Sequence, residues 1–229
     1  MPLPEKTASS RIRSFIRRQG RLTTGQQFAL DNHWNTYCLD PKAECDFTAL
    51  FGRNAPLIVE IGFGNGESLA KMAAANPDTD YIGIEVHKPG VGHLMMLLDQ
   101  QALSNVRIYC HDAIEILEQK IPDNSLAGVH LFFPDPWPKK KHHKRRIVSL
   151  SFVELLAKKL TSEGYFHAAT DWQNYAQAML KVLSAENILT NTSATGDYCL
   201  RPEYRPLTKF EQRGIRLGHG VWDLIFKKA

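Results

Sequence analysis

The sequence predicts an α/β protein with a Rossmann-like, doubly wound and mostly parallel β-sheet. Three observations support this class. Short apolar segments alternate with segments of helical length, the first of these apolar segments ends in a glycine-rich turn, and 43% of the 229 residues are hydrophobic. Alternating strands and helices are typical of a parallel sheet covered on both faces, and the composition suffices for one sizeable core.

The regular pattern begins at Leu57 and continues almost to the C-terminus. Apolar runs bounded by turns predict strands at 57–62, 81–86, 106–110, 127–133, 164–169, 188–194 and 221–227. Helical spacing and helix stop signals predict helices at 67–75, 92–103, 113–119, 147–160 and 172–183, and one further helix is expected within 26–55. The run at 127–133 is almost continuously apolar, as expected of a central parallel strand.

Residues 1–25 are interpreted as a basic N-terminal extension, and residues 26–229 as the folded domain. The extension is polar and weakly periodic, so we expect it to be mobile when free. It lacks the apolar segment of a secretory signal, and no apolar run approaches the roughly 18–20 residues that span a membrane. The four cysteines lack metal-binding spacing. We expect a cytoplasmic protein with reduced thiols, no metal site and no membrane association.

Positive charge is concentrated in two blocks. Residues 1–21 contain six Lys or Arg against one Glu, and residues 139–146 (KKKHHKRR) contain six Lys or Arg and no acid. The whole chain has a net charge of only +4, so the remainder is acidic, with a net charge of −7. Two basic blocks on an acidic body favour a polyanionic partner, although a solubilising tail and a solvated loop would show the same composition.

Acidic residues follow the predicted strands at the points where those strands end. Parallel sheets bind ligands at the carboxyl ends of their strands. We therefore expect the functional groups at 60–66, Glu85, Asp112, Asp135 and Asp171 to share one rim of the sheet.

The segment 60–66 (EIGFGNG) forms a glycine-rich turn between strand and helix, in which Gly62, Gly64 and Gly66 allow a tight turn and close approach of a ligand. Glu85 lies 19 residues beyond the last of them, the place of a carboxylate that binds ribose hydroxyls. Asp112 could accept the exocyclic amine of adenine. Glu60 would repel a pyrophosphate but suits an ammonium or a sulfonium. These features indicate S-adenosyl-L-methionine, and the set is similar to the class I methyltransferase pattern.

The predicted central strand ends in a proline-rich loop, FFPDPWP at 132–138, which adjoins the basic run directly. Three prolines restrict this loop and so present Asp135 on a stiff support, unless the loop is only a structural turn. Phosphate-binding side chains beside a base-sized pocket suit a nucleic acid, because phosphate contacts position it and base contacts specify it.

With these motifs, the chain resembles the bacterial tRNA (guanine-N7-)-methyltransferase family over essentially its whole length. The resemblance is carried by the segments SFIRRQGR at 14–21, the Glu60 glycine turn, FPDPWP with its basic run, TD at 170–171 and TKFE at 208–211. It implies methylation of guanine N7 in tRNA, at guanine 46 of the variable loop, with S-adenosyl-L-methionine as the methyl donor and tRNA as the partner. No obligatory protein partner is indicated.

The resemblance also implies roles for individual residues. Catalysis is assigned to Asp135; cofactor binding to Glu60, Gly62, Gly64, Gly66, Glu85, Asp112 and Asp135; substrate binding to Lys139, Asp171, Thr208, Lys209, Phe210 and Glu211; and RNA contact to Arg17, Arg18, Arg21, Lys140, Lys141, His142, His143, Lys144, Arg145 and Arg146. Members commonly carry Met at the position of Asn65, and this departure removes no charged or catalytic group.

Several alternatives stay open from the sequence alone. Asp171 could simply be the N-cap of the next helix, and 208–211 could be a polar surface turn. A methyltransferase fold without activity could serve as an RNA-binding module, although the intact acids argue against it. A nicotinamide-dependent oxidoreductase is disfavoured by Glu60 and by Glu67, which replaces the third fingerprint glycine. An amino-group methyltransferase is a further alternative, because Asp-Pro-Trp is similar to its motif.

Overall fold

The computed structural model describes residues 12–15, 20–216, 218 and 220–229, without the side chains of Lys209, Phe210, Arg213 and Ile215. In the described part, one seven-stranded sheet has the order β3-β2-β1-β4-β5-β7-β6. Its strands are β1 (Leu57–Ile61), β2 (Asp80–Ile84), β3 (Val106–Tyr109), β4 (Leu126–Phe132), β5 (Leu160–Thr170), β6 (Leu189–Asn191) and β7 (Trp222–Lys228). The predicted fold class is therefore confirmed.

Strands β1 to β5 pair in parallel, and β7 pairs antiparallel with both β5 and β6. The chain runs outward from β1 to β3 and then returns to β4 on the other side of β1. The strand order therefore reverses between β1 and β4, and at such a point a crevice opens at the carboxyl ends of the strands. Because β7 is antiparallel, its first residue lies at the same rim as the last residues of β4 and β5.

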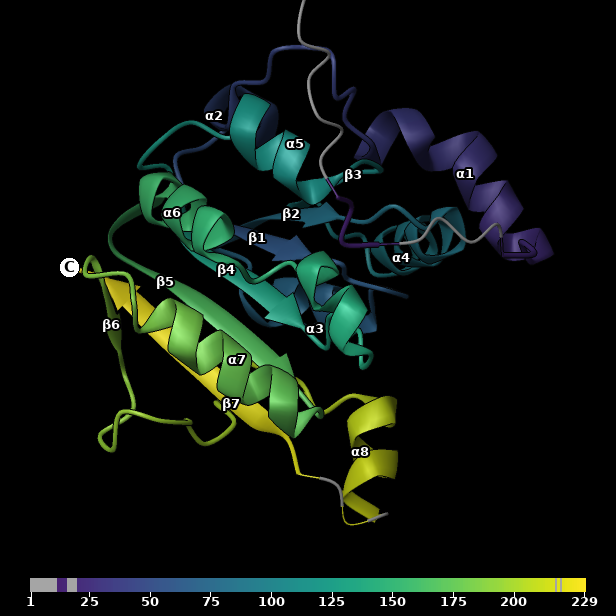
Figure 1. Cartoon of the computed structure of the whole chain (residues 1–229). Coiled ribbons are helices and arrows are strands. Elements are labelled where there is room, and N and C mark those ends of the chain that lie inside the picture. Colours follow the sequence, from purple (N-terminus) through teal and green to yellow (C-terminus); the bar gives the residue numbers. More distant parts are fainter. Residues whose placement is uncertain (1–11, 16–19, 217, 219) are drawn as a thin grey trace, which may run out of the picture.

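Helices cover both faces of the sheet (Figure 1). They are α1 (Thr24–Tyr37), α2 (Phe47–Phe51), α3 (Glu67–Ala75), α4 (Lys88–Gln100), α5 (Ala113–Gln119), α6 (Leu150–Lys159), α7 (Gln173–Leu183) and α8 (Lys209–Arg216), with a 3₁₀ helix η1 (Lys140–Arg145) before α6. Buried residues of α1, α3 and α4 form one apolar cluster with the sheet, and those of α5, α6 and α7 form the other.

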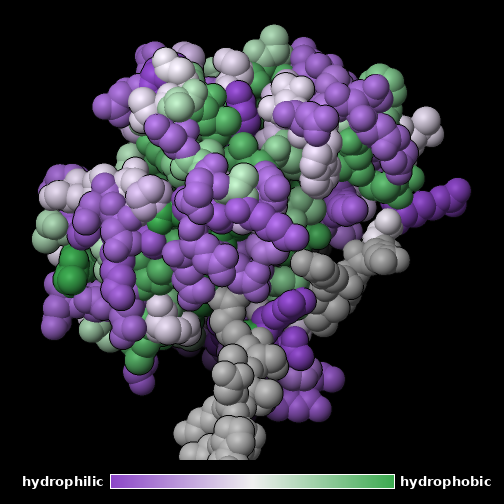
Figure 2. Space-filling view, turned by 90° about the horizontal axis from the view of Figure 1, so that it is seen from above, coloured by the Kyte–Doolittle hydropathy of each residue, from purple (hydrophilic) through white to green (hydrophobic). Residues whose placement is uncertain are grey.

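The central strands are buried on both faces. Every residue of β1 and of β2 is buried, which explains why these segments are mostly apolar apart from Glu60 in β1 and Asp80 in β2. On the surface seen from above, hydrophilic side chains are mixed with small hydrophobic patches (Figure 2). In the described ranges, no helix combines the length and the apolar character needed to cross a membrane.

Three helices differ from the predictions, each for a local reason. The segment 26–55 holds two helices instead of one, because Asp46 caps α2 through the N–H groups of Thr48 and Ala49 and Gly52 ends it in the left-handed region. Helix α4 begins at Lys88, four residues early, since Pro89 is tolerated in a first turn. Helix α6 begins only at Leu150, because Ser149 is its N-cap.

The predicted end of the extension, residue 25, lies within the first turn of α1. Thr23 and Gln26 form a capping box there: the Thr23 N–H donates to Gln26 Oε1 at 2.9 Å, and the Gln26 N–H donates to Thr23 Oγ1 at 3.2 Å. The expected mobility of the extension concerns mostly residues 1–11 and 16–19, which lie outside the described residues.

Candidate active site

The glycine turn after β1 has the backbone geometry that its composition predicts. Gly62, Gly64 and Gly66 have φ angles of 70°, 60° and 76°, in the left-handed region that other residues avoid. A Cβ added at Gly62 or Gly64 would meet nothing within 4 Å, whereas one at Gly66 would lie 2.6 Å from the Cβ of Leu94. The first two glycines therefore face open space, and the third allows α3 and α4 to pack closely.

Glu60 is a buried carboxylic acid beneath this turn. It is 2% exposed, and its Oε2 has no hydrogen-bond partner among the described residues. Burial raises the pKa of Glu60 from 4.5 to about 8, and the nearby negative charge of Glu85 adds to the shift. A buried acid without a partner is costly, so this oxygen is suited to a cationic or hydrogen-bond-donating group of a ligand.

Glu85 follows β2 and is held by three backbone amides. Its Oε2 accepts from the Gly64 N–H at 3.0 Å, and its Oε1 accepts from the N–H groups of Val86 and His87 at 2.7 and 3.0 Å. These bonds fix the carboxylate at the rim next to the glycine turn. Asp112 is 4% exposed and caps α5, with its Oδ1 accepting from the Ile114 N–H at 2.9 Å.

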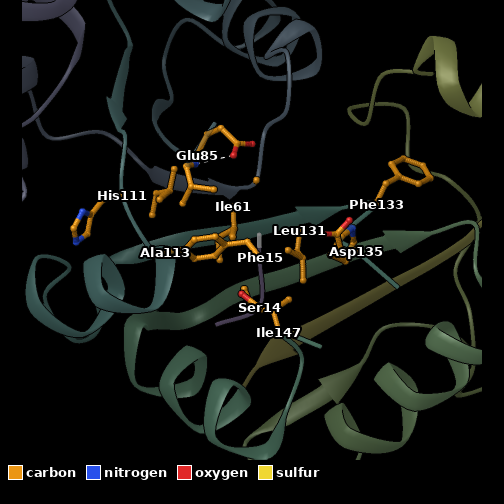
Figure 3. A pocket seen from close by; sticks show the side chains of 14 residues that line it. Ser14, Phe15, Ile61, Glu85, His111, Ala113, Leu131, Phe133, Asp135 and Ile147 are labelled. Carbon is orange, nitrogen blue, oxygen red and sulfur yellow. Dashed lines mark hydrogen bonds between the residues drawn. The ribbon is translucent and has the colours of Figure 1, made fainter. Parts of the chain in front are cut away.

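A cavity of about 220 Å³ lies between the ends of β1, β2 and β4. Gly62, Glu85 and Asp135 line it, together with the two neighbours of Asp112 along the chain. Ser14 and Phe15 of the N-terminal segment also line it, and the Phe15 ring lies in its middle (Figure 3). The predicted rim thus brings Gly62 of the glycine turn, Glu85 and Asp135 around one cavity.

Asp135 is exposed on the proline-rich loop that follows β4. Two non-glycine residues of this loop have positive φ angles, 51° at Phe133 and 45° at Trp137, a conformation that persists only where surrounding contacts impose it. The Phe133 N–H donates to the Ala169 carbonyl at 2.7 Å, and the Trp137 indole N–H donates to the Ser14 carbonyl at 3.1 Å. Contacts at both ends therefore hold Asp135 in a defined place.

The basic run continues from this loop, and its four lysines are exposed. Lys139 precedes η1, and Lys140, Lys141 and Lys144 are exposed on it. The Arg145 guanidinium lies 5.1 Å from the centre of the Trp137 ring, and His142 contacts the same ring edge-on at 5.8 Å. Partial burial, followed by the positive charges of Lys141 and Arg145, lowers the pKa of His142. His143 is half-buried.

Arg146 differs from the rest of the run. It is only 9% exposed and donates to the Pro136 carbonyl and to Asn174 Oδ1, both at 2.9 Å. Its guanidinium also lies 4.6 Å from the centre of the Tyr175 ring. These contacts tie the proline-rich loop to α7, so we no longer expect Arg146 to bind phosphate. Among the remaining predicted RNA contacts, Arg21 is exposed, and Arg17 and Arg18 lie outside the described residues.

Asp171 follows β5 on the same rim and is half-buried. The N-cap of α7 is Trp172, without a side-chain cap bond, so the alternative of Asp171 as N-cap is wrong. Thr208 precedes α8, and its Oγ1 accepts from the Glu211 N–H at 3.1 Å. The segment is thus a helix start and not a simple surface turn. Glu211 is only 3% exposed, and the side chains of Lys209 and Phe210 lie outside the described part.

The sequence reasoning missed a buried polar cluster behind this rim. Its buried members are Arg205, Asp223, His167 and Glu211, and the hydroxyl of the more exposed Tyr204 is hydrogen-bonded to His167. A signal was present, since Asp223 and His167 stand in otherwise apolar strand segments, and buried charges need partners. The two N-terminal residues in the cavity, Ser14 and Phe15, were likewise not expected to line it.

Comparison with known proteins identifies related methyltransferases. A family model for methyltransferases matches residues 54–224, which is more than half of the chain. The tRNA (guanine-N(7)-)-methyltransferase of Sodalis glossinidius is 60% identical over 97% of this chain and 93% of its own length. The enzymes of the same name from Yersinia enterocolitica and Salmonella typhimurium are 58% and 55% identical, each over 96% of this chain and 93% and 92% of their own lengths.

Solved structures share the fold at low sequence identity. The 16S rRNA methyltransferase KamB superposes with a TM-score of 0.60 at 16% identity, over 82% of this chain and 95% of its own. The aminoglycoside resistance methyltransferase NpmB1 has a TM-score of 0.54 at 12% identity, over 80% of this chain and 92% of its own. The structures support the fold, and the close relatives identify the family: this chain belongs to the tRNA (guanine-N(7)-)-methyltransferases.

Proposed function

We propose that this protein transfers a methyl group from S-adenosyl-L-methionine to N7 of a guanine in tRNA, with guanine 46 of the variable loop as the target that the family resemblance implies. One observation carries the proposal. Asp135 lines one cavity together with Gly62 of the glycine turn and Glu85, and the basic run begins four residues further on with the exposed Lys139.

The residues around the cavity fit the proposed methyl donor. The open space beside Gly62 and Gly64 would admit the methionine part, and the unpartnered oxygen of Glu60 would accept from its ammonium group. Glu85 would bind the ribose hydroxyls with its remaining lone pairs, and the loop around Asp112 would hold the adenine. When bound, the donor supplies the activated methyl group.

Asp135 would act by its charge and not as a base. Guanine N7 has a free lone pair and carries no proton, so its attack needs no general base. The guanine becomes cationic as the methyl group arrives. A nearby carboxylate stabilises that developing charge more than the neutral ground state, and this difference lowers the barrier. The same carboxylate could accept from the guanine N1–H, which adenine lacks.

The tRNA would lie across the rim above the cavity. We propose that Lys140, Lys141, Lys144 and Arg145 bind its phosphates, joined by Arg21 and the arginines of the extension, 1–25. The exposure of the three lysines and of Arg21, and the continuity of the basic run with the Asp135 loop, support this placement. His142 and His143 flank these cations. Lys139, Asp171 and the start of α8 would contact the nucleotide itself, which must leave its stack to reach the cavity.

Incubation of the protein with unmodified tRNA and labelled S-adenosyl-L-methionine tests the function directly. We expect label in 7-methylguanosine after digestion of the tRNA to nucleosides, at one position of the sequence. Asp135→Ala is the matched control, because it removes an exposed side chain and should strongly slow labelling while donor binding persists. Label in a methylated amino group would favour the amino-group methyltransferase, and donor binding without any labelling would favour an RNA-binding module.

A further inference from the structure

Arg205 is a fully buried arginine in the loop between β6 and α8, with 1% exposure. Its guanidinium bridges two carboxylates. The Nη1 and Nη2 atoms donate to the two oxygens of Glu211, both at 2.7 Å, and Nε and Nη2 donate to the two oxygens of Asp223 at 2.6 and 2.9 Å. The planar guanidinium binds both carboxylates through paired hydrogen bonds and so fixes their positions relative to each other. The single ammonium group of a lysine could not do this.

The pair of Arg205 and Asp223 is held in its charged form. Burial alone would lower the pKa of Arg205, but the hydrogen bonds to Glu211 and Asp223 raise it above its ordinary value. Burial alone would raise the pKa of Asp223, but His167 and Arg205 lower it. A carboxylate only accepts, so His167 Nε2–H donates to Asp223 Oδ1 at 2.8 Å, and its Nδ1 accepts from the Tyr204 hydroxyl at 2.9 Å.

This cluster lies directly behind the loop that carries Asp135. Asp223 is the register partner of Ala169 on β5, and the Ala169 carbonyl accepts from the Phe133 N–H. The Arg205 guanidinium lies 5.6 Å from the centre of the Phe133 ring. Phe133 has the positive φ angle noted above, which surrounding contacts must impose. Arg205 is therefore one of the groups that hold the turn leading to Asp135.

On its other side, the same guanidinium holds the first turn of α8. Both oxygens of Glu211 are bonded to Arg205, and Thr208 caps that turn through the Glu211 N–H. Glu211 is 3% exposed, so its carboxylate faces the guanidinium and not the solvent. One buried side chain thus connects the Asp135 loop with the helix start that carries the segment TKFE.

We propose that Arg205 is a positioning residue for methyl transfer, which keeps the Asp135 loop and the first turn of α8 in one fixed relative geometry, and that Glu211 acts through Arg205 instead of touching the substrate. The inference rests on the proposed function. Stability alone would not require this arrangement, because buried ion pairs can often be replaced by well-packed apolar residues without loss of stability.

The test compares Arg205→Lys, Glu211→Gln and the double variant. Lysine keeps the positive charge but loses the fork and the planar contact with Phe133. Glutamine keeps the shape of Glu211 and leaves the pair between Arg205 and Asp223 intact. Glu211→Gln therefore still tests the proposal if Arg205→Lys does not fold. Single-turnover rates with tRNA are measured beside tRNA affinity, S-adenosyl-L-methionine affinity and melting temperature.

The matched control is Arg53→Lys. Arg53 pairs with the buried Asp80 at 2.6 and 3.1 Å, and Asp80 is the first residue of β2, at the end of that strand away from the cavity. This control disturbs another arginine paired with a buried carboxylate. We expect it to lower the melting temperature while the methyl-transfer rate stays at the wild-type level.

We expect Arg205→Lys to slow transfer by about tenfold to a hundredfold, because small misplacements of reacting groups have effects of that size. Both affinities should stay within about threefold of wild type. Glu211→Gln should also slow transfer at unchanged tRNA affinity, and the double variant should be no slower than Arg205→Lys, as expected of two residues in one network.

Three results would overturn the inference while the wild type methylates tRNA. Wild-type rates in both single variants would show that Arg205 positions nothing. A loss of tRNA affinity in Glu211→Gln alone would show that Glu211 touches the substrate. If Arg53→Lys slowed methyl transfer as much as Arg205→Lys at the same loss of melting temperature, the role of Arg205 would be structural only. If the wild-type protein itself produced no 7-methylguanosine, the proposed function would be wrong, and the positioning role would fall with it.

Discussion

Replacing Glu60 with glutamine tests whether the cofactor site is built at the expense of stability. The Glu60 carboxyl is buried, and its pKa is raised from 4.5 to about 8. The folded protein therefore holds a proton there at neutral pH that the unfolded chain releases. Keeping this proton lowers the free energy of unfolding relative to a protein with an unshifted carboxyl. This loss of stability is absent below about pH 4.5, grows as the pH rises and is complete above about pH 8.

The magnitude follows from the size of the shift. Each pH unit between the two pKa values costs about 1.4 kcal/mol, so the loss of stability should grow by roughly 3–4 kcal/mol between pH 5 and pH 8. Glutamine cannot ionise, so Glu60→Gln lacks this dependence. The free energy of unfolding of the wild type should fall by that amount relative to the variant over this range. Any difference in packing is independent of pH and cancels in the comparison.

Urea denaturation at several pH values between 5 and 8 measures the difference. The control is Glu163→Gln, because the hydrogen bond from Lys227 lowers the pKa of this exposed carboxyl, which stays ionised throughout the range. Its difference from wild type should be flat. If the difference in free energy of unfolding between wild type and Glu60→Gln were also independent of pH, Glu60 would not be a buried acid that stays protonated at neutral pH. Glu60→Gln should also bind S-adenosyl-L-methionine more weakly, because glutamine is a weaker acceptor than a carboxylate for the ammonium group of the donor.

Three further predictions address the site. Asp135→Asn should lose about 2–4 kcal/mol of transition-state stabilisation, nearly as much as alanine, with donor binding intact; near wild-type single-turnover rates would contradict the charge argument. Replacing Lys140 and Lys144 with alanine should lower the slope of log tRNA affinity against log salt by about one to two units, and an unchanged slope would mean a solvated loop. Gly64→Val should abolish donor binding by calorimetry, whereas Gly66→Ala, which would collide with α4, should cost about 2–4 kcal/mol of stability in denaturant unfolding.

The strands and the chemistry at their ends could be predicted from the sequence because both depend on local signals. A parallel strand that is buried on both faces is mostly apolar, and β1 is apolar at every position except Glu60. Parallel strands bring their carboxyl ends to one rim, so the positions of Glu85 and Asp135 followed from where the apolar runs stop. The positive φ angles at Gly62 and Gly64 followed likewise from the residue type.

Helix boundaries were less predictable, because capping decides them within one or two residues. The helix predicted to begin at residue 92 in fact begins at Lys88, with Pro89 in its first turn. Asp171 was a plausible N-cap by residue type, yet the helix begins one residue later without a side-chain cap. Such choices depend on how the preceding strand enters the turn, which residue types alone do not specify.

The sequence by itself determined the fold class, the rim with its acids and glycines, and the basic run, because periodicity, turn chemistry and charge are properties of neighbouring residues. Only the tertiary structure decided which charged side chains face solvent. Arg146 and Glu211 match the motifs, yet both are buried against partners that the chain brings together from elsewhere. Arg205 and Asp223 are 18 residues apart and belong to different elements, so no local pattern shows that they pair with each other. A buried charge is defined by its partners, and those partners exist only after the chain has folded.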